Sequence, residues 1–134
     1  MASRRILRDT VSLFNYVGEV NGDAAYQETI LTVCYCPLNE GADLNMQGRK
    51  ANDSARLYIF DRQTVAKSVS GTKRTYLPHE RWEKENDKSP YWTLSDEGQD
   101  YFKKQGAERQ LRVVGFSHKV NGTPRMWHFE VDGR

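Results

Sequence analysis

Cysteine and histidine are scarce in this chain, with two cysteines and three histidines among 134 residues. So few cysteines exclude a disulfide-bonded scaffold. Cys34 and Cys36 lie two apart in a strand-like run, a spacing that does not favour a disulfide between them, so we expect reduced, half-buried thiols. His118 and His128 could approach them across the fold, but the spacing matches neither a zinc ribbon nor a zinc finger. We therefore expect no metal and no cofactor.

The chain also lacks a long hydrophobic run and a clear excess of charge of one sign. No stretch approaches the roughly 18 apolar residues of a membrane-spanning helix, and the start has no apolar secretory core. We therefore expect no membrane partner and synthesis in a cytoplasm. The net charge of +2 is too small to indicate nucleic acid by itself. Arg4, Arg5 and Arg8 are interpreted as a solvated N-terminal arm over residues 1–9.

Catalytic signatures are missing as well. No glycine-rich phosphate loop follows a strand-like run, and no serine lies in a nucleophile-elbow pattern. The acidic pairs Asp96/Glu97 and Glu83/Glu85 lie in polar segments where nothing indicates a raised pKa, so we interpret them as solvated. The sequence therefore predicts that the protein is not an enzyme.

What the sequence does contain is a series of β-branched and aromatic runs, as strands prefer. They lie at residues 10–17, 25–36, 55–60 and 91–94, with a final pair at 110–118 and 125–132. The second run is apolar on both faces near its end, which favours a barrel or sandwich over an open sheet. We predict a mainly β protein over residues 1–134: a single domain, a small antiparallel β-barrel or sandwich with long loops and one or two short helices.

The first run does not alternate cleanly between apolar and polar positions. Val11 and Leu13 share one parity, whereas Phe14 and Tyr16 share the other. A β-bulge would reconcile the two sets on one face. Residues 21–23 (Asn-Gly-Asp) then form a turn signal between the first two strands.

A C-terminal hairpin over residues 110–132 is the clearest local feature. Asn121-Gly122 between two β-patterned runs is the strongest short-range hairpin signal. Trp127, Phe129 and Val131 alternate with more polar residues. We therefore predict that all three side chains enter the core.

Two long polar segments interrupt the strands. Residues 37–54 form a long loop, and such loops inside compact domains are usually functional or disordered. Residues 61–104 form a polar insertion in which short helices are expected, over residues 77–84 and from Ser95 through 104.

Large aromatic residues gather in this polar insertion, where a small core has difficulty using them all. They are Tyr76, Trp82, Tyr91, Trp92, Tyr101 and Phe102. We favour the interpretation that most of them anchor the insertion to the domain. Trp82, Tyr91 and Trp92 are the candidates for contact with a neighbouring subunit, because interfaces favour Trp and Tyr.

Three stretches carry a resemblance to a known family. They are RILRDTVSLFNY at 5–16, the ordered motifs YLPHERW, YWTL and DYF within 76–102, and GTPRMWHFEVDGR at 122–134. Over about half of its length the chain resembles a family of minor capsid proteins of tailed bacteriophages, which is similar in turn to head-completion, or stopper, proteins. None of these motifs is catalytic.

The resemblance implies a structural protein of the virion, assembled in the host cytoplasm. Stopper proteins are small β-barrels that form a ring below the portal, retain DNA and dock the tail. The implied partners are copies of the chain itself and the portal, adaptor and tail proteins. The loop at 37–54 matches the stopper loop that reaches toward the channel. Within it, Arg49 and Lys50 are candidate DNA contacts, and Leu44 and Met46 are candidate contacts to a neighbour.

A different class of function stays open. An OB-like barrel that binds nucleic acid would use exposed aromatics with Arg and Lys on one sheet face. The terminal hairpin offers Arg112, Lys119 and Arg125, although its aromatics are needed for the core. The choice among stopper, adaptor and tail-side component also stays open.

Overall fold

The computed structural model describes residues 8–39, 54–82, 89–97 and 99–134. Within these residues the chain forms ten strands and one short 3-10 helix. They are β1 (Asp9–Val20), β2 (Asp23–Cys34), β3 (Leu38–Asn39), β4 (Ser54–Phe60), β5 (Val65–Ser68), β6 (Thr75–Tyr76), β7 (Tyr91–Trp92), β8 (Tyr101–Lys104), β9 (Leu111–Lys119), η1 (Pro124–Met126) and β10 (His128–Gly133). The prediction of a mainly β protein is confirmed.

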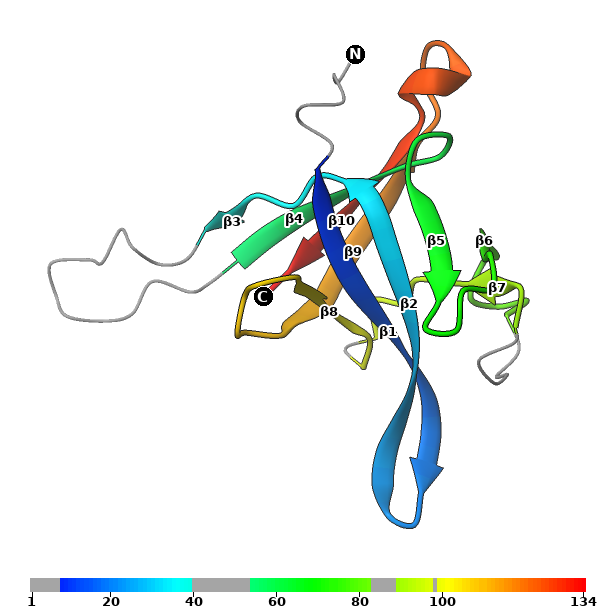
Figure 1. The fold of residues 1–134 in the computed structure, drawn as a ribbon, viewed down its shortest axis with the longest axis vertical. Coiled ribbons are helices and arrows are strands. Elements are labelled where there is room, and N and C mark those ends of the chain that lie inside the picture. Colours follow the sequence, from blue (N-terminus) through cyan, green and yellow to red (C-terminus); the bar gives the residue numbers. More distant parts are fainter. Residues whose placement is uncertain (1–7, 40–53, 83–88, 98) are drawn as a thin grey trace, which may run out of the picture.

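Eight of these strands form one antiparallel sheet in the order β3-β4-β10-β9-β8-β1-β2-β5, and β6 and β7 form a separate parallel pair. The two halves of the large sheet cross at a steep angle (Figure 1). Just beyond β2, Tyr35 pairs with Tyr58 of β4 through backbone hydrogen bonds of 3.2 and 2.8 Å. Among the described residues this isolated bridge does not extend into a ladder between β2 and β4. The sheet therefore bends back on itself without closing into a barrel, which was one of the two predicted arrangements.

The hairpin of β1 and β2 projects beyond the rest of the sheet (Figure 1). Val20 pairs with Asp23, which leaves Asn21 and Gly22 as a two-residue turn with φ values of 52° and 85°. Positive φ at both positions is the requirement of a type I′ turn, which Asn-Gly meets at little cost. The turn signal at residues 21–23 is thus confirmed. From Gly18 of β1 and Ala25 of β2 to the tip, the two strands pair only with each other among the described strands.

The core lies between the two halves of the bent sheet. Alternate residues of β1, β2, β4, β9 and β10 point inward, as the period of two requires. The segment from 89 to 97 closes the core and contributes Trp92 and Leu94. The largest fully buried apolar side chains are Val11, Leu13, Leu31, Leu57, Leu94, Phe102, Val113 and Val131. The polar insertion therefore supplies part of the core.

The short helices predicted in the polar insertion are not formed where the structure describes it. Residues 101–104 are strand β8, because Phe102 fills the core and pairs with Leu13 of β1. This tertiary pairing outweighs the weak local helix propensity. Near residue 78, Trp82 N donates to Pro78 O at 3.0 Å in a single turn. The helix that the structure contains in its described part is η1, which follows the terminal Asn-Gly.

The C-terminal hairpin is present, but its turn differs from the prediction. The last β9–β10 pair joins Lys119 to His128, so residues 120–127 form an eight-residue connection rather than a tight Asn-Gly turn. Phe129 and Val131 are buried as predicted, whereas Trp127 is half-buried and its Nε1 donates to Gly122 O at 3.3 Å. The core assignment of Trp127 is wrong because this residue ends η1, outside the alternation of β10.

Candidate interaction groove

An aromatic cluster covers the outer face of β1, β2 and β8. Phe14 and Tyr16 point away from the core, because the alternate residues of β1 fill it. Tyr26 lies opposite Tyr16, and Tyr101 lies opposite Phe14. The rings of Phe14 and Tyr101 stack at 4.6 Å, and Tyr26 meets Tyr101 edge-on at 4.9 Å. These four residues are called the aromatic cluster below.

The two sets of apolar residues in the first run already indicated two different faces. The β-bulge interpretation instead placed both sets on the core face. Register shifts do occur in β1, between Asp9 and Val11 and between Tyr16 and Gly18. Between them the alternation is strict, so the bulges do not bring the aromatics to the core face. The second parity of aromatic residues marks a second, outward-facing aromatic surface instead.

A groove with a volume of about 630 Å³ lies beside the aromatic cluster. This volume falls within the range of roughly 300–1,000 Å³ that ligand sites occupy. Its lining comprises Tyr16, Tyr26 and Tyr101 of the cluster, Glu19 and Ala24 of the hairpin, and Gln99, Gln110, Arg112, Val114 and Arg134. This tyrosine groove therefore combines aromatic, apolar and cationic groups.

The tyrosine groove carries two arginines, Arg112 and Arg134, against one acid, Glu19. Arg112 of β9 lies directly opposite Tyr101, and its backbone exchanges hydrogen bonds of 2.9 and 3.0 Å with Arg134. Within the described part of the chain, neither guanidinium has an acidic partner at ion-pair distance. Glu28 ends the same row of the sheet, opposite Phe14. The row thus runs from an acid across two aromatics to an arginine.

A buried polar network holds the cluster from below. Asn15 Nδ2 donates to Asp100 Oδ2 and to Thr93 O, both at 2.8 Å, and Tyr16 N donates to Asp100 Oδ1 at 2.8 Å. Burial raises the pKa of the Asp100 carboxyl, and the hydrogen bonds from Tyr16 and Asn15 offset part of that rise. Asn15 and Asp100 are the chain neighbours of Tyr16 and Tyr101. The network therefore fixes where two rings of the groove lie.

A second hollow, of about 360 Å³, lies between the sheet and β6. Here His118 Nε2 lies 2.7 Å from Asp61 Oδ2, and its ring stacks on Phe129 at 3.9 Å. Arg74, at the same hollow, is buried and donates to Ser89 O at 3.0 Å and to backbone oxygen of Glu28 at 2.6 Å. These charged groups hold neighbouring strands together.

The two thiols lie at the corner where the chain leaves β2. Cys34 and Cys36 are fully buried rather than half-buried, and Asp9 Oδ2 accepts from Cys36 N at 2.7 Å. Val33 has a φ of 59°, and its carbonyl accepts from Thr64 Oγ1 at 2.8 Å. Burial is the main cause that raises the pKa of Cys34 to about 12 and that of Cys36 to about 11. Both are thus protonated and unreactive at neutral pH.

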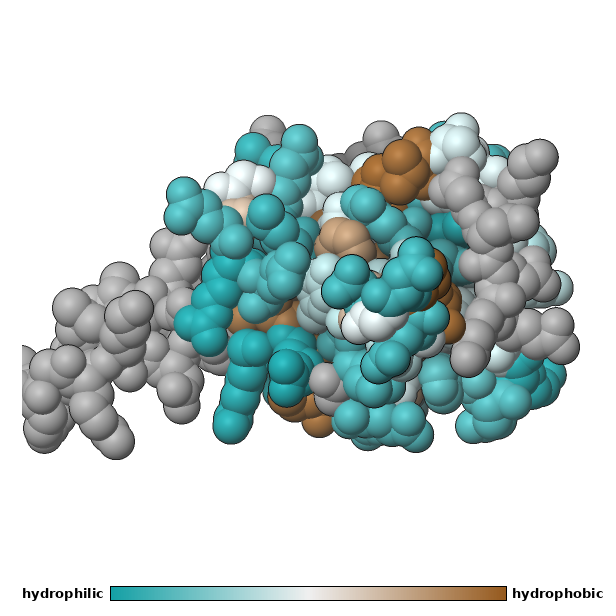
Figure 2. Space-filling view, turned by 90° about the horizontal axis from the view of Figure 1, so that it is seen from below, coloured by the Kyte–Doolittle hydropathy of each residue, from teal (hydrophilic) through white to brown (hydrophobic). Residues whose placement is uncertain are grey.

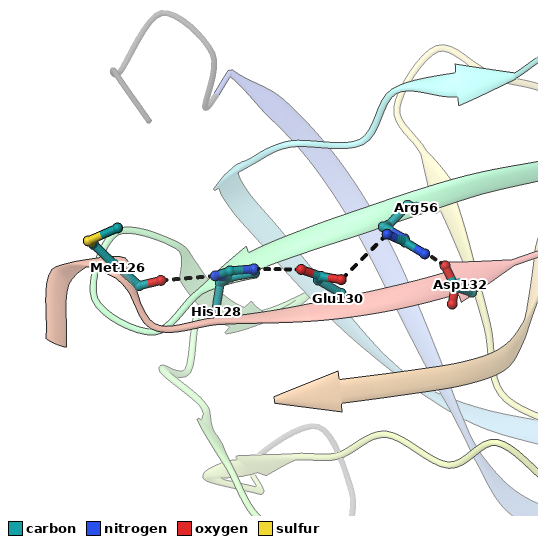
Figure 3. Close-up of polar contacts among 5 residues, drawn as sticks. All are labelled: Arg56, Met126, His128, Glu130 and Asp132. Carbon is teal, nitrogen blue, oxygen red and sulfur yellow. Dashed lines mark hydrogen bonds and ion pairs between the residues drawn. The ribbon is translucent and has the colours of Figure 1, made fainter. Parts of the chain in front are cut away.

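His128, the other histidine considered as a metal ligand, belongs to a chain of polar contacts on the surface. His128 Nδ1 bonds Met126 O at 2.9 Å and Nε2 bonds Glu130 at 3.0 Å, while Arg56 bridges Glu130 and Asp132 (Figure 3). Among the residues that the structure describes, no three His, Cys, Asp or Glu side chains gather as metal ligands do. The absence of a metal or cofactor in the protein stays a prediction.

The site residues predicted from the sequence fall into three groups. Leu44, Met46, Arg49 and Lys50 lie outside the described residues. Trp82 and Trp92 are buried in their own domain, which favours anchoring over contact with a neighbour. Tyr91 is 41% exposed and stays a candidate for an interface.

Comparison with known proteins adds no relative. No family model, no curated protein and no solved structure matches this chain. The described residues also include no helix long and apolar enough to span a membrane.

Proposed function

We propose that this protein is a non-enzymatic structural subunit of a tailed-bacteriophage particle that works in the connector between head and tail. In this proposal it is a head-closure, or stopper, subunit that assembles as a ring below the portal, retains DNA and docks the tail. Its partners are further copies of the chain and the portal, adaptor and tail proteins, and packaged DNA is an incidental contact. The virion is its location.

One observation carries the proposal beyond the resemblance of the sequence. The molecule is elongated, and the connection between β9 and β10 projects at the end opposite the β1–β2 hairpin (Figure 1). Each projection carries exposed apolar side chains, Val20 on the hairpin and Val120 and Met126 on the other connection. A ring subunit of a connector needs one contact with its neighbouring copies and another with the next protein along the channel, and two separate projections can provide them.

The surface supports contacts of modest size. Viewed from the hairpin end, it is mostly hydrophilic and carries separate hydrophobic patches (Figure 2). Small patches give weak pairwise contacts, and a ring multiplies each of them by symmetry. The surface therefore suits a subunit whose single contacts are weak and whose assembly as a ring is firm.

The decisive experiment is an electron micrograph of phage particles labelled on this protein. Label at the neck supports the proposal. Label spread over the shell, or absent from particles, overturns it.

Point variants test the two projections separately. Val20→Asp and Val120→Asp are expected to reduce the yield of tailed particles, because each places a charge in an apolar contact. Val69→Asp is the matched control, because Val69 is 62% exposed and Val20 is 61% exposed, but Val69 lies in the turn after β5. Equal effects of all three variants would contradict the assignment of the two ends.

A second candidate is binding of single-stranded nucleic acid, which the tyrosine groove favours. Bases stack on aromatic side chains, and Arg pairs with phosphate. Glu19 in the groove and Glu28 on the same sheet row weigh against it, because they repel phosphate. Binding of a labelled oligonucleotide with a steep salt dependence would favour this candidate.

A further inference from the structure

We propose that the tyrosine groove receives the tip of the β1–β2 hairpin of a second copy of this chain. The inference deepens the proposed function, since it rests on ring assembly and names the surface through which neighbouring subunits meet. It stands on the geometry of the groove, the charges of the two surfaces and the shape of the hairpin.

The charges of the two surfaces are complementary. The hairpin tip carries the exposed acid Asp23 beside the Asn-Gly turn, while Glu19 lines the groove of its own chain. The groove still has a net positive charge, because it contains two arginines against that one acid. Within the described part of the chain, these acids have no cationic partner at ion-pair distance. Arg112 and Arg134 of the groove likewise have no acidic partner at ion-pair distance among the described residues. Unpaired charges of opposite sign on two exposed surfaces steer those surfaces together.

The apolar groups also match. Val20 is one of the most exposed large apolar side chains among the described residues, and it stands at the tip. The groove offers Val114, which is exposed on β9, beside the aromatic cluster. Tyr and Arg are the residue types that protein interfaces favour. A mixed groove of this kind suits a protein segment better than a phosphate chain.

The hairpin is built to reach out of its own subunit. Its tip pairs with no other described strand, and an isolated two-stranded ribbon is marginally stable in water. Packing in the groove of a neighbour would stabilise it. Because the tip and the groove are different surfaces of each copy, the contact can repeat head to tail and close into a ring.

Charge reversal tests the pairing in the full-length chain. Arg112→Glu alone and Asp23→Lys alone are each expected to weaken self-association by at least about tenfold in sedimentation velocity across a concentration series. The double variant restores the opposite charges and is expected to recover most of the wild-type association. Recovery in the double variant also separates loss of the contact from misfolding.

Lys119→Glu and Asp96→Lys are the matched controls, because both residues are exposed and neither lines the groove. The controls are expected to associate like the wild type. Added salt is expected to weaken the wild-type association, because it screens exposed charges.

A crosslink captures the contact even when it is weak. An Asp23→Cys chain mixed with an Arg112→Cys chain is expected to form a disulfide-linked pair faster than an Asp23→Cys chain mixed with Lys119→Cys. The native thiols do not compete, because they are buried.

Three results would overturn the inference: a monomer at every concentration with no selective crosslink, self-association that ignores both reversals, or capture of labelled oligothymidylate in the groove in place of self-association. Label at the particle neck together with any of these would leave the proposed function standing and reject this interface. Label away from the neck together with the expected effects of the charge reversals would reject the proposed function and leave this interface standing.

Discussion

Adding one methyl group at Gly133 is expected to destabilise the folded protein by about 1–3 kcal/mol, the usual cost of overpacking a core. Gly133 is buried near the end of β10. A Cβ atom there would lie 2.5 Å from Phe102 Cζ, 2.6 Å from Phe102 Cε1 and 3.1 Å from Leu111 Cβ. Phe102 is fully buried, so its rigid ring cannot move aside without displacing the rest of the core.

Gly115 provides the matched control for Gly133→Ala. It lies on the neighbouring strand β9, opposite Asp132, and a Cβ atom there meets nothing within 4 Å. Gly115→Ala is therefore expected to change stability by no more than about 0.5–1 kcal/mol. Urea unfolding followed by tryptophan fluorescence measures both variants, and the slope m should stay unchanged.

A double variant tests the cause of the effect. Phe102→Leu removes the ring atoms that the new methyl group would meet, so Gly133→Ala should cost less in that background than in the wild type. Equal stability of Gly133→Ala and Gly115→Ala, or strict additivity with Phe102→Leu, would refute the reasoning.

Three further predictions concern the core, the thiols and the buried acid. Trp92→Ala should lower the free energy of unfolding by about 3–5 kcal/mol because Trp92 lies in the core, whereas Trp127→Ala should lower it clearly less. Similar melting temperatures for the two variants would contradict this. Cys34 and Cys36 should not react with a thiol reagent at pH 8 in the folded protein and should both react in denaturant, because burial holds their pKa values near 12 and 11; rapid labelling of the native state would be inconsistent with them. Asp100 has a raised pKa, so its ionisation costs folding stability; the cost is absent below the unfolded pKa of about 3.9 and fully present above the folded pKa. Wild type should therefore lose stability relative to Asp100→Asn as the pH rises through that window, and a difference between the two that does not change with pH would argue against it.

The groove and the polar insertion show which structural features an alternating strand pattern does not predict. Phe14 and Tyr16 were visible as a second parity in the first run, yet their outward placement depends on β8 and β2 packing beside them. Arg112 lies 11 residues beyond Tyr101 in sequence and directly opposite it in the sheet. No local pattern in the sequence reports such a neighbour.

The sequence by itself determined the β class, the turn at residues 21–23 and the C-terminal hairpin, because alternation and turn chemistry act between residues close along the chain. Only the tertiary structure decided that residues 101–104 form a strand, that Trp127 stays outside the core and that three tyrosines line an outer groove. Each of these depends on which distant strand supplies the partner. The free energy of burying Phe102 between β1 and Gly133 is larger than any local preference of its segment, and a single segment carries no record of that partner.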